Sequence, residues 1–409
     1  MSKVLVIGTG GVGRVVAYKC AQAPEMFDEI HVANRTFVKA EKLKSDIKRD
    51  AGITVYAHEL DADDTSAVAD LMKDVRPDIA VHVALPYQNI PVMKACLEAK
   101  VHYMDTAISE TLDSAVYDYR WQKAYHERFR DNGLVALLGC GFDPGATNVM
   151  CAYAQKNLFD RIKTIDILDC NAGDHGQHFM PNFNPEINIR EVTQNARYWE
   201  KGKGWVGMPS ILDDDALHFS FDYPVVGNHE SYILFHEEEM SLIENIKDLE
   251  RIRFWMTFTP DYIKHLSVLK NTGLTSIVPV NHQGQEIVPV QFLQSVLPKS
   301  GNVADTYTGK TAIGCVFNGI KDNEEISRYI YQICDHQDSF KETGIHAIAY
   351  TTGVPAMVGA MLIADGTWNR PGVYHPEQFN PDPFMKEIGE RGLPWQVVDG
   401  KKYLESLPK

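Results

Sequence analysis

A glycine-rich segment near the start of the chain carries the clearest chemical signal in the sequence. Three glycines spaced G-x-G-x-x-G directly follow the apolar run 4–7 and open a helical pattern. The first glycine permits a tight turn, the second lets the backbone approach a pyrophosphate, and the third allows the helix to pack against the strand. The amides at the start of the helix are then left to bind phosphate. The residues predicted to bind the phosphates are Gly8, Gly10, Gly11, Val12 and Gly13.

Because a strand, a loop and a helix occur in the right order, this pattern predicts a dinucleotide site and not merely a turn. A fold of this kind that has lost its ligand is the alternative. The end of the next β-rich run carries Asn34, Arg35 and Thr36, where an NAD enzyme would place Asp or Glu. A cation and hydroxyl donors suit a 2′-phosphate, so we expect NADP(H) in preference to NAD(H). An arginine that only caps a loop would give the same sequence.

Further cofactor contacts are expected where later strands end. Asp61 follows the third run and would either edge the adenine ring or cap the next helix. The end of the fourth run marks the carboxyl edge of the sheet, where ligands of open α/β sheets bind. The residues predicted to contact the cofactor there, and at the end of the fifth run, are Ala84, Leu85, Pro86, Tyr87 and Thr106.

These residues are positioned by an alternation of β-rich and helical segments up to about residue 140. The β-rich runs are 3–8, 29–34, 54–59, 79–84, 102–106 and 134–138, and the helical patterns are 13–22, 38–50, 64–74, 90–99 and 113–131. Strands separated by helices at this spacing predict βαβ units and a parallel, doubly wound Rossmann sheet. We therefore expect a nucleotide-binding domain at 1–145.

The pattern of predicted strands and helices changes after 139–145, a segment with glycines and a proline that interrupts regular structure. Alternating strands at 162–170, 252–259 and 311–318 lie between long polar loops, which predicts a second α+β domain with a mainly antiparallel sheet over 146–345. The apolar stretch 347–364 contains small residues suited to packing on a sheet. It predicts a helix that returns to the first domain, so 346–409 is assigned there.

Composition narrows the possible functions. The chain has 409 residues, 44% hydrophobic and 23% charged, which excludes a disordered or fibrous protein. Its net charge of −15 argues against a nucleic-acid partner, which needs a basic surface. The seven cysteines are scattered without a C-x-x-C pair, so we expect free thiols, no metal site and a reducing, cytoplasmic setting. The absence of an apolar leader or of about 18 consecutive apolar residues predicts no membrane association.

Several motifs together resemble the saccharopine dehydrogenase family. They are the glycine loop, Asn34-Arg35-Thr36, Ala84-Leu85-Pro86-Tyr87, Tyr103-Met104-Asp105-Thr106, Gly141-Phe142-Asp143-Pro144-Gly145 and Thr352-Gly353-Val354-Pro355-Ala356. Later motifs are similar to the branch of this family that makes carboxylated polyamines. They are Asp169-Cys170-Asn171-Ala172-Gly173-Asp174-His175, His236-Glu237-Glu238-Glu239 and Gly372-Val373-Tyr374-His375-Pro376-Glu377.

The resemblance implies a reductive condensation. An amino-acid aldehyde, L-aspartate β-semialdehyde, forms an imine with a diamine, putrescine or 1,3-diaminopropane, and NADPH reduces it to carboxyspermidine or carboxynorspermidine. Such a site needs groups that handle protons, an acceptor for the distal ammonium and donors for the substrate carboxylate. The resemblance also implies a homodimer formed through the second domain.

The same resemblance suggests which side chains act on the substrates. Asp143 would orient or protonate an amine, or cap the helix that starts near Gly145. Asp105 would contact substrate or nicotinamide, or satisfy loop amides. The substrate-pocket candidates are Asp174, His175, Arg190, Arg197, Glu237 and Glu239. The alternatives are a metal site or solvated polar residues for Asp174 and His175, a solvated face for Glu237 and Glu239, and surface or inter-domain salt bridges for Arg190 and Arg197.

Two other functions fit the glycine loop equally well. One is a saccharopine or lysine-pathway dehydrogenase that uses an α-keto acid. The other is a non-catalytic NADP-binding sensor built on the same fold.

Overall fold

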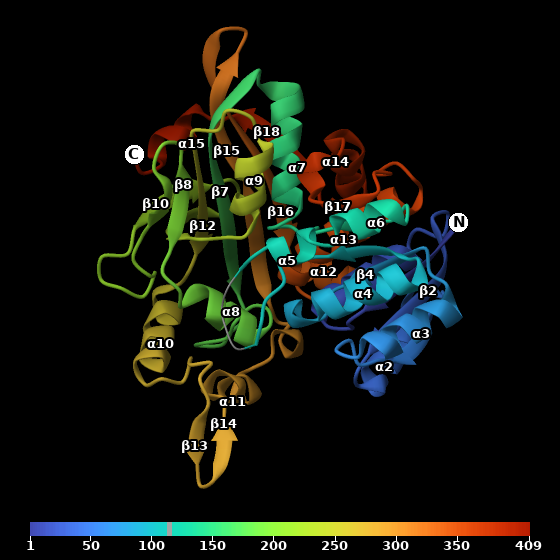
Figure 1. The fold of residues 1–409 in the computed structure, drawn as a ribbon. Helices are drawn as coiled ribbons and strands as arrows, with labels where there is room; N and C mark the ends of the chain where they lie inside the picture. Colours follow the sequence, from blue (N-terminus) through green and yellow to red (C-terminus); the bar gives the residue numbers. More distant parts are fainter. Residues whose placement is uncertain (113–116) are drawn as a thin grey trace. The chain divides into compact units, whose positions relative to one another are not determined.

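The computed structural model describes residues 1–112 and 117–409, and the chain divides into two units (Figure 1). Unit 1 comprises Met1–Thr111, Val116–Ala152 and Ala349–Leu393, and unit 2 the rest of the chain. The sequence assigned all of 346–409 to the first domain, which is wrong for 394–409. There, β18 (Trp395–Asp399) pairs antiparallel with β16 (Glu324–Asp335), and α15 (Lys401–Ser406) follows in the same unit.

Unit 1 is built on a seven-stranded parallel sheet in the order β17-β6-β5-β4-β1-β2-β3. Its strands are β1 (Ser2–Ile7), β2 (Phe27–Asn34), β3 (Tyr56–Glu59), β4 (Ile79–His82), β5 (His102–Asp105), β6 (Val135–Leu137) and β17 (Gly372–Tyr374). The inner strands read as continuous apolar runs because helices cover both faces of a parallel sheet. The predicted doubly wound sheet is confirmed, with β17 as an added edge strand.

Helices connect the strands of unit 1. They are α1 (Gly11–Ala21), α2 (Phe37–Ala51), α3 (Thr65–Val75), α4 (Asn89–Ala99), α5 (Arg120–Lys123), α6 (His126–Asp131), α7 (Ala146–Tyr153), α13 (Ala347–Ala364) and α14 (Pro381–Glu390), with short 3-10 turns at Pro86–Gln88 and Pro376–Gln378. The single helix predicted over 113–131 is wrong. Positions 113–116 lie outside the described residues, and the rest holds two short helices. Asp118 accepts the Arg120 N–H at 2.8 Å and so starts α5 anew.

Helix α13 packs tightly in unit 1 because its small residues allow it. A Cβ on Gly353 would lie 2.5 Å from Val15 of α1, and one on Gly359 would lie 2.6 Å from the Cys140 sulfur. By length and composition alone this helix is long enough and apolar enough to cross a membrane, but 83% of it is buried inside the protein. Such burial is typical of a core helix.

Unit 2 is built on a mixed nine-stranded sheet. Its main path runs β10-β11-β12-β7-β15-β16-β18, with β8 and β9 attached to β12. The strands are β7 (Arg161–Asp174), β8 (Arg197–Glu200), β9 (Gly204–Gly207), β10 (His218–Tyr223), β11 (Gly227–Leu234), β12 (Arg251–Thr257), β15 (Thr308–Lys321), β16 and β18. All pairs are antiparallel except β12 with β7. The mainly antiparallel second domain is thereby confirmed.

The remaining elements of unit 2 flank this sheet or project from it (Figure 1). They are α8 (Pro185–Val192), α9 (Glu238–Asn245), α10 (Pro260–Asn271), α11 (Pro289–Val296), α12 (His336–Thr343), and the hairpin β13 (Val280–His282) and β14 (Gln285–Ile287). An aromatic core lies against the sheet, with Phe221, Tyr223, Trp255 and Tyr329 almost fully buried. The sheet carries the polar loops at its ends.

Candidate functional site

The three glycines of the loop serve different purposes. Gly8 has φ +108°, and a Cβ there would lie 2.7 Å from the Val83 carbonyl oxygen. A Cβ on Gly13 would lie 1.9 Å from the carbonyl oxygen of Gly8. A Cβ on Gly10 would meet nothing within 4 Å among the described atoms. The fold itself therefore requires Gly8 and Gly13, whereas Gly10 faces open space where a pyrophosphate fits.

The start of α1 has the features of an anion site. Its N-cap is Gly10, which supplies no side-chain cap, and the first turn contains no acidic residue. Within the described residues, the buried Thr9 hydroxyl has no hydrogen-bond partner. Free amides at a helix N-terminus, without a competing carboxylate, attract phosphate. The residues present therefore fit a bound dinucleotide.

The Arg35 side chain is exposed and could bind a second phosphate group, beside the pyrophosphate. The Asn34 side chain accepts the Thr36 N–H at 2.8 Å, so Asn34 and not Arg35 closes the loop. Arg35 is exposed, and in the described part of the chain no carboxylate pairs with it. An exposed guanidinium next to a hydroxyl is the donor set that a 2′-phosphate needs.

The segment after β3 decides whether Asp61 caps the next helix. Asp64, not Asp61, caps α3 and accepts N–H bonds from Ser66 and Ala67. Asp61 is exposed and accepts the Asp63 N–H at 3.1 Å. Capping of the helix by Asp61 is therefore wrong, because the chain turns once more before α3 begins.

The turn after β4 is well ordered by its own contacts. His82 is buried, and its Nε2 lies 3.1 Å from the Leu85 carbonyl oxygen. Burial lowers the pKa of His82 to about 4, so this ring is neutral. The Gln88 amide donates to Asp63 at 2.9 Å and links this turn to the end of β3. The segment Ala84–Tyr87 thus lies at the carboxyl edge of the sheet, as a cofactor-binding turn requires, with Ala84 exposed.

Asp105 is held firmly at the end of β5. It is 1% exposed and accepts three hydrogen bonds, from the Tyr103 hydroxyl at 2.8 Å, the Gln122 amide at 2.6 Å and the Gly139 N–H at 2.7 Å. Burial raises the pKa of Asp105 to about 7 although all three bonds favour the anion. The bond from the Gly139 N–H agrees with the alternative in which Asp105 only accepts hydrogen bonds from loop amides. The adjacent Thr106 is partly exposed.

Asp143 lies partly exposed in a turn that leads into α7. The Gly145 N–H donates to the Asn148 side chain at 2.9 Å, and the Ala146 and Thr147 amides donate to backbone carbonyl oxygens. Other acceptors thus take these first amides of the helix. The same Asn148 donates to Glu377 at 3.0 Å, which brings a second carboxylate to the turn.

The predicted loop residues of unit 2 adjoin a polar network that the sequence did not indicate. Asp174 is exposed and accepts the Gly176 N–H at 2.7 Å. The His175 ring meets the Tyr307 ring edge-on at 5.4 Å. The Tyr307 hydroxyl accepts from Asn171 at 2.6 Å and donates to Asn182 at 2.9 Å.

Two histidines complete this network. The His336 ring stacks on the Tyr307 ring at 3.8 Å, and its Nε2 lies 3.0 Å from Oδ1 of the Asn171 side chain. Burial lowers the pKa of His336 to about 3 and that of His346 to about 4, so both rings are neutral. Gly173 makes room, since a Cβ there would lie 2.5 Å from His336. In the sequence, only Gly173, which lies inside the motif 169–175, could have indicated that another side chain packs closely there.

The two predicted arginines have different surroundings. Arg190 is buried, lies 3.7 Å from Glu186 and donates to the Leu112 carbonyl oxygen at 3.3 Å. Its charge is thus engaged inside unit 2. Arg197 lies over the rings of Phe235 at 3.9 Å and Trp205 at 4.7 Å. Burial lowers the pKa of Arg197, while the nearby Glu239 opposes that shift.

Glu237 and Glu239 lie at the start of a helix. Glu237 is the N-cap of α9, and Glu239 lies in its first turn. Carboxylates at a helix N-terminus are stabilised by the helix dipole, which explains why this acidic run is helical. The structure also brings Glu191 and Glu238 to the same place through His236.

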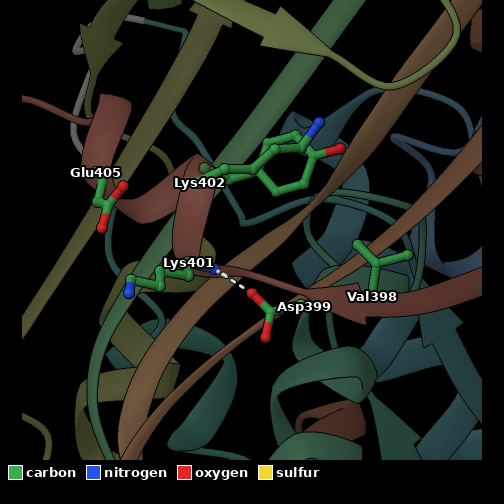
Figure 2. A pocket seen from close by; sticks show the side chains of 6 residues that line it. Val398, Asp399, Lys401, Lys402 and Glu405 are labelled. Carbon is green, nitrogen blue, oxygen red and sulfur yellow. Dashed lines mark hydrogen bonds between the residues drawn. The ribbon is translucent and has the colours of Figure 1, made fainter.

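A surface pocket at the C-terminal helix holds none of the predicted residues (Figure 2). It is lined by Val398, Asp399, Lys401, Lys402, Tyr403 and Glu405. The Lys401 N–H donates to Asp399 at 2.9 Å, which starts α15. Across the described ranges, no three His, Cys, Asp or Glu side chains are arranged to hold a metal ion.

Comparisons with known proteins agree with this geometry. Residues 4–137 match the saccharopine dehydrogenase NADP binding domain, and residues 141–393 match the saccharopine dehydrogenase C-terminal domain. The chain is 50% identical to carboxyaminopropylagmatine dehydrogenase of Synechocystis sp., over 98% of both chains. It is 39% identical to carboxynorspermidine synthase of Vibrio cholerae, over 97% of both. Its fold matches apo saccharopine dehydrogenase (L-Glu forming) from Saccharomyces cerevisiae with a TM-score of 0.71 at 15% identity, covering 97% of this chain and 100% of that one.

Proposed function

Because the chain belongs to the saccharopine dehydrogenase family, we propose that it reductively condenses L-aspartate β-semialdehyde with an amine that carries a second cationic group. It is an NADP-dependent oxidoreductase of the carboxynorspermidine dehydrogenase type. Putrescine and 1,3-diaminopropane are the diamines considered first. The relative at 50% identity adds agmatine, because its name describes a carboxyaminopropyl derivative of that amine.

The proposed reaction has two stages. The aldehyde carbon and the primary amine form a C=N bond with loss of one water molecule. When bound, the reduced cofactor supplies a hydride to the imine carbon, and a proton reaches the nitrogen, which yields a secondary amine and NADP⁺. The first stage requires proton transfer to the departing oxygen, and the second requires an imine held in one orientation.

The observation that carries the cofactor assignment is Arg35, which is exposed beside Thr36 and pairs with no described carboxylate. We assign the 2′-phosphate to Arg35 and Thr36, and the pyrophosphate to the amides of Gly10, Gly11 and Val12. We further assign proton handling to Asp143, the partly exposed carboxylate of the turn before α7. Asp105, which accepts three donors, is assigned the role of holding the end of β5 in position.

A substrate panel tests this proposal. NADPH oxidation is followed with aspartate β-semialdehyde alone and with putrescine, 1,3-diaminopropane, agmatine or butylamine. Turnover that depends on an amine with a second cationic group supports the proposal. Turnover with lysine and 2-oxoglutarate instead would identify a saccharopine-forming enzyme, and cofactor binding with no turnover would identify a sensor.

The proposal includes a homodimer formed through unit 2. Light scattering coupled to size-exclusion chromatography tests it, since a monomer at micromolar concentration would contradict it.

A further inference from the structure

A buried group in unit 2 contains more acidic than basic side chains. We call Glu191, His236, Glu238 and Glu239 the α9 cluster. Glu238 and Glu239 lie in the first turn of α9 and are both 0% exposed. His236 joins the two helices, since its Nδ1 pairs with Glu238 and its Nε2 lies 3.6 Å from Glu191 of α8.

The nearby cations do not balance these carboxylates. The positive groups that face the cluster are His236, when protonated, and Arg197. Asp169 on β7 adds a further negative charge beside Glu191. Among the described side chains, these four carboxylates thus have two cationic groups acting on them, His236 and Arg197. Burying an unmatched charge is costly, so the cluster needs either protons or an additional cation.

Three carboxylate oxygens in the α9 cluster also lack hydrogen-bond donors. Glu239 accepts the His236 N–H at 3.1 Å through one oxygen only. Its other oxygen, and one oxygen each of Glu191 and Glu238, are buried and have no hydrogen-bond partner in the described part of the chain. Native proteins rarely leave buried acceptors without donors, so these three oxygens indicate a missing ligand that donates N–H bonds.

When no cation is bound, protons on the carboxylates of the α9 cluster reduce its negative charge. Burial raises the pKa of Glu191 to about 7 and that of Glu239 well above its usual range. The charge of Glu238 raises both pKa values further, so Glu238 lies within electrostatic range of the other two. The groups that face the cluster from the packed elements are Asp169 of β7, Arg197 of β8, and Tyr262 of α10.

We propose that the α9 cluster binds the distal cationic group of the amine substrate, an ammonium or a guanidinium; this inference rests on the proposed function. Glu191 and His236 form the edge that solvent reaches, with side chains 13% and 12% exposed. The cation enters at this edge against Glu191, with Glu238 and Glu239 behind it. An organic cation suits the site better than a metal ion, because the described side chains here lack the arrangement that a metal needs.

This assignment predicts how amine binding depends on pH. The bound cation replaces protons held by the carboxylates, so its binding releases protons. Amine affinity should therefore rise as pH increases through about 7, the pKa of Glu191. A simple contact with permanently ionised carboxylates would show no such dependence near neutral pH.

The first test compares charge-neutralising variants. Glu191→Gln and Glu239→Gln should each raise the KM for putrescine and agmatine by about 10- to 100-fold, the loss of one charge-assisted contact. The KM for aspartate β-semialdehyde should stay within about twofold, and butylamine turnover should not change. The matched control is Glu286→Gln, which removes the same charge from the exposed β14 hairpin and should behave as wild type.

The second test uses the unaltered protein, so it does not depend on a variant that folds. Putrescine and agmatine are titrated by calorimetry into the NADP-bound enzyme at pH 6.5, in buffers of different ionisation enthalpy. Proton release on binding, absent with butylamine, supports the site, and the amine with the lower Kd identifies whether ammonium or guanidinium is preferred. Binding without proton release would overturn it.

Failure of the site and failure of the proposed function are distinguishable. Normal turnover of diamines together with unchanged KM values in Glu191→Gln and Glu239→Gln would overturn the site and leave the function intact. Equal turnover of butylamine and putrescine in the wild type would also overturn the site. If no amine supports NADPH oxidation with any aldehyde, the proposed function fails first.

Discussion

The backbone N–H of Gly139 donates to Oδ1 of Asp105 at 2.7 Å. This bond ties the end of β5 to the segment that leads from β6 into the Asp143 turn. The same carboxylate accepts the Tyr103 hydroxyl and the Gln122 amide, so one buried side chain joins three parts of unit 1.

The pH dependence of folding should reveal this buried carboxylate. Burial raises the pKa of Asp105 to about 7 in the folded state, against roughly 3.9 when unfolded. Between these values the folded state binds more protons, so the contribution of Asp105 to stability is complete below about pH 4 and is lost as pH rises through 7. The difference amounts to at most about 4 kcal/mol, at about 1.4 kcal/mol per pKa unit.

Asp105→Asn should flatten this dependence. Chemical denaturation at several pH values from 4.5 to 8 measures the free energy of unfolding of both proteins. The difference between wild type and variant should vary with pH, whereas the exposed Asp61→Asn control should give a constant difference. Parallel curves for wild type and Asp105→Asn would contradict the raised pKa.

Alanine substitutions at two glycines of the cofactor loop should affect different properties, stability at Gly13 and NADPH affinity at Gly10. Gly13→Ala places a Cβ 1.9 Å from a backbone oxygen, so we expect a loss of about 3 kcal/mol or more in stability, or failure to fold. Gly10→Ala meets no described atom within 4 Å and should fold with nearly normal stability. Its methyl group would occupy the path of the pyrophosphate, so the NADPH Kd should rise about tenfold or more, the loss of one close contact.

Thermal melting and fluorescence titration with NADPH measure these two effects. A stable Gly10→Ala variant with normal NADPH affinity would show that the pyrophosphate lies elsewhere.

Cofactor selectivity should depend on Arg35. Arg35→Ala removes an exposed guanidinium that pairs with no described carboxylate, so the fold should be unaffected. Binding of NADPH should weaken by about 1.5–3 kcal/mol, the scale of a hydrogen bond to a charged group, while NADH binding stays nearly constant. Lys39→Ala, a change of the same charge on α2, serves as the control. Equal losses for both cofactors would show that Arg35 does not bind the 2′-phosphate.

The role assigned to Asp143 predicts a defect in turnover alone. Asp143→Asn should lower kcat by about 10²-fold or more, the scale of general acid–base catalysis, with NADPH affinity close to wild type. Steady-state kinetics and cofactor titration separate the two quantities. Normal turnover with a lowered melting temperature would instead assign Asp143 to the structure of the turn.

Local patterns in the sequence were sufficient to predict most strands and helices of the nucleotide-binding unit. Strand, glycine loop and helix at 4–22 form one continuous segment, and within it the Gly8 carbonyl oxygen constrains Gly13. Gly8 is constrained by Val83, which follows β4 much later in the chain. Because parallel strands with covering helices are apolar on both faces, their runs were visible without tertiary information. Short-range competition was harder to predict, as Asp64 and not Asp61 caps α3.

Tertiary structure alone decided which distant segments meet in unit 2. The C-terminal strand β18 pairs with β16 because its edge was available, and nothing in 394–409 indicates that partner. Glu191 and Glu238 become neighbours only when α8 and α9 pack beside His236, and Tyr307 meets His336 only when β15 and α12 come together. The glycine loop and Arg35 could be identified from the sequence because the spacing of adjacent residues is enough to recognise them. Burial and charge balance in the α9 cluster depend on long-range packing, so they exist only in the folded chain.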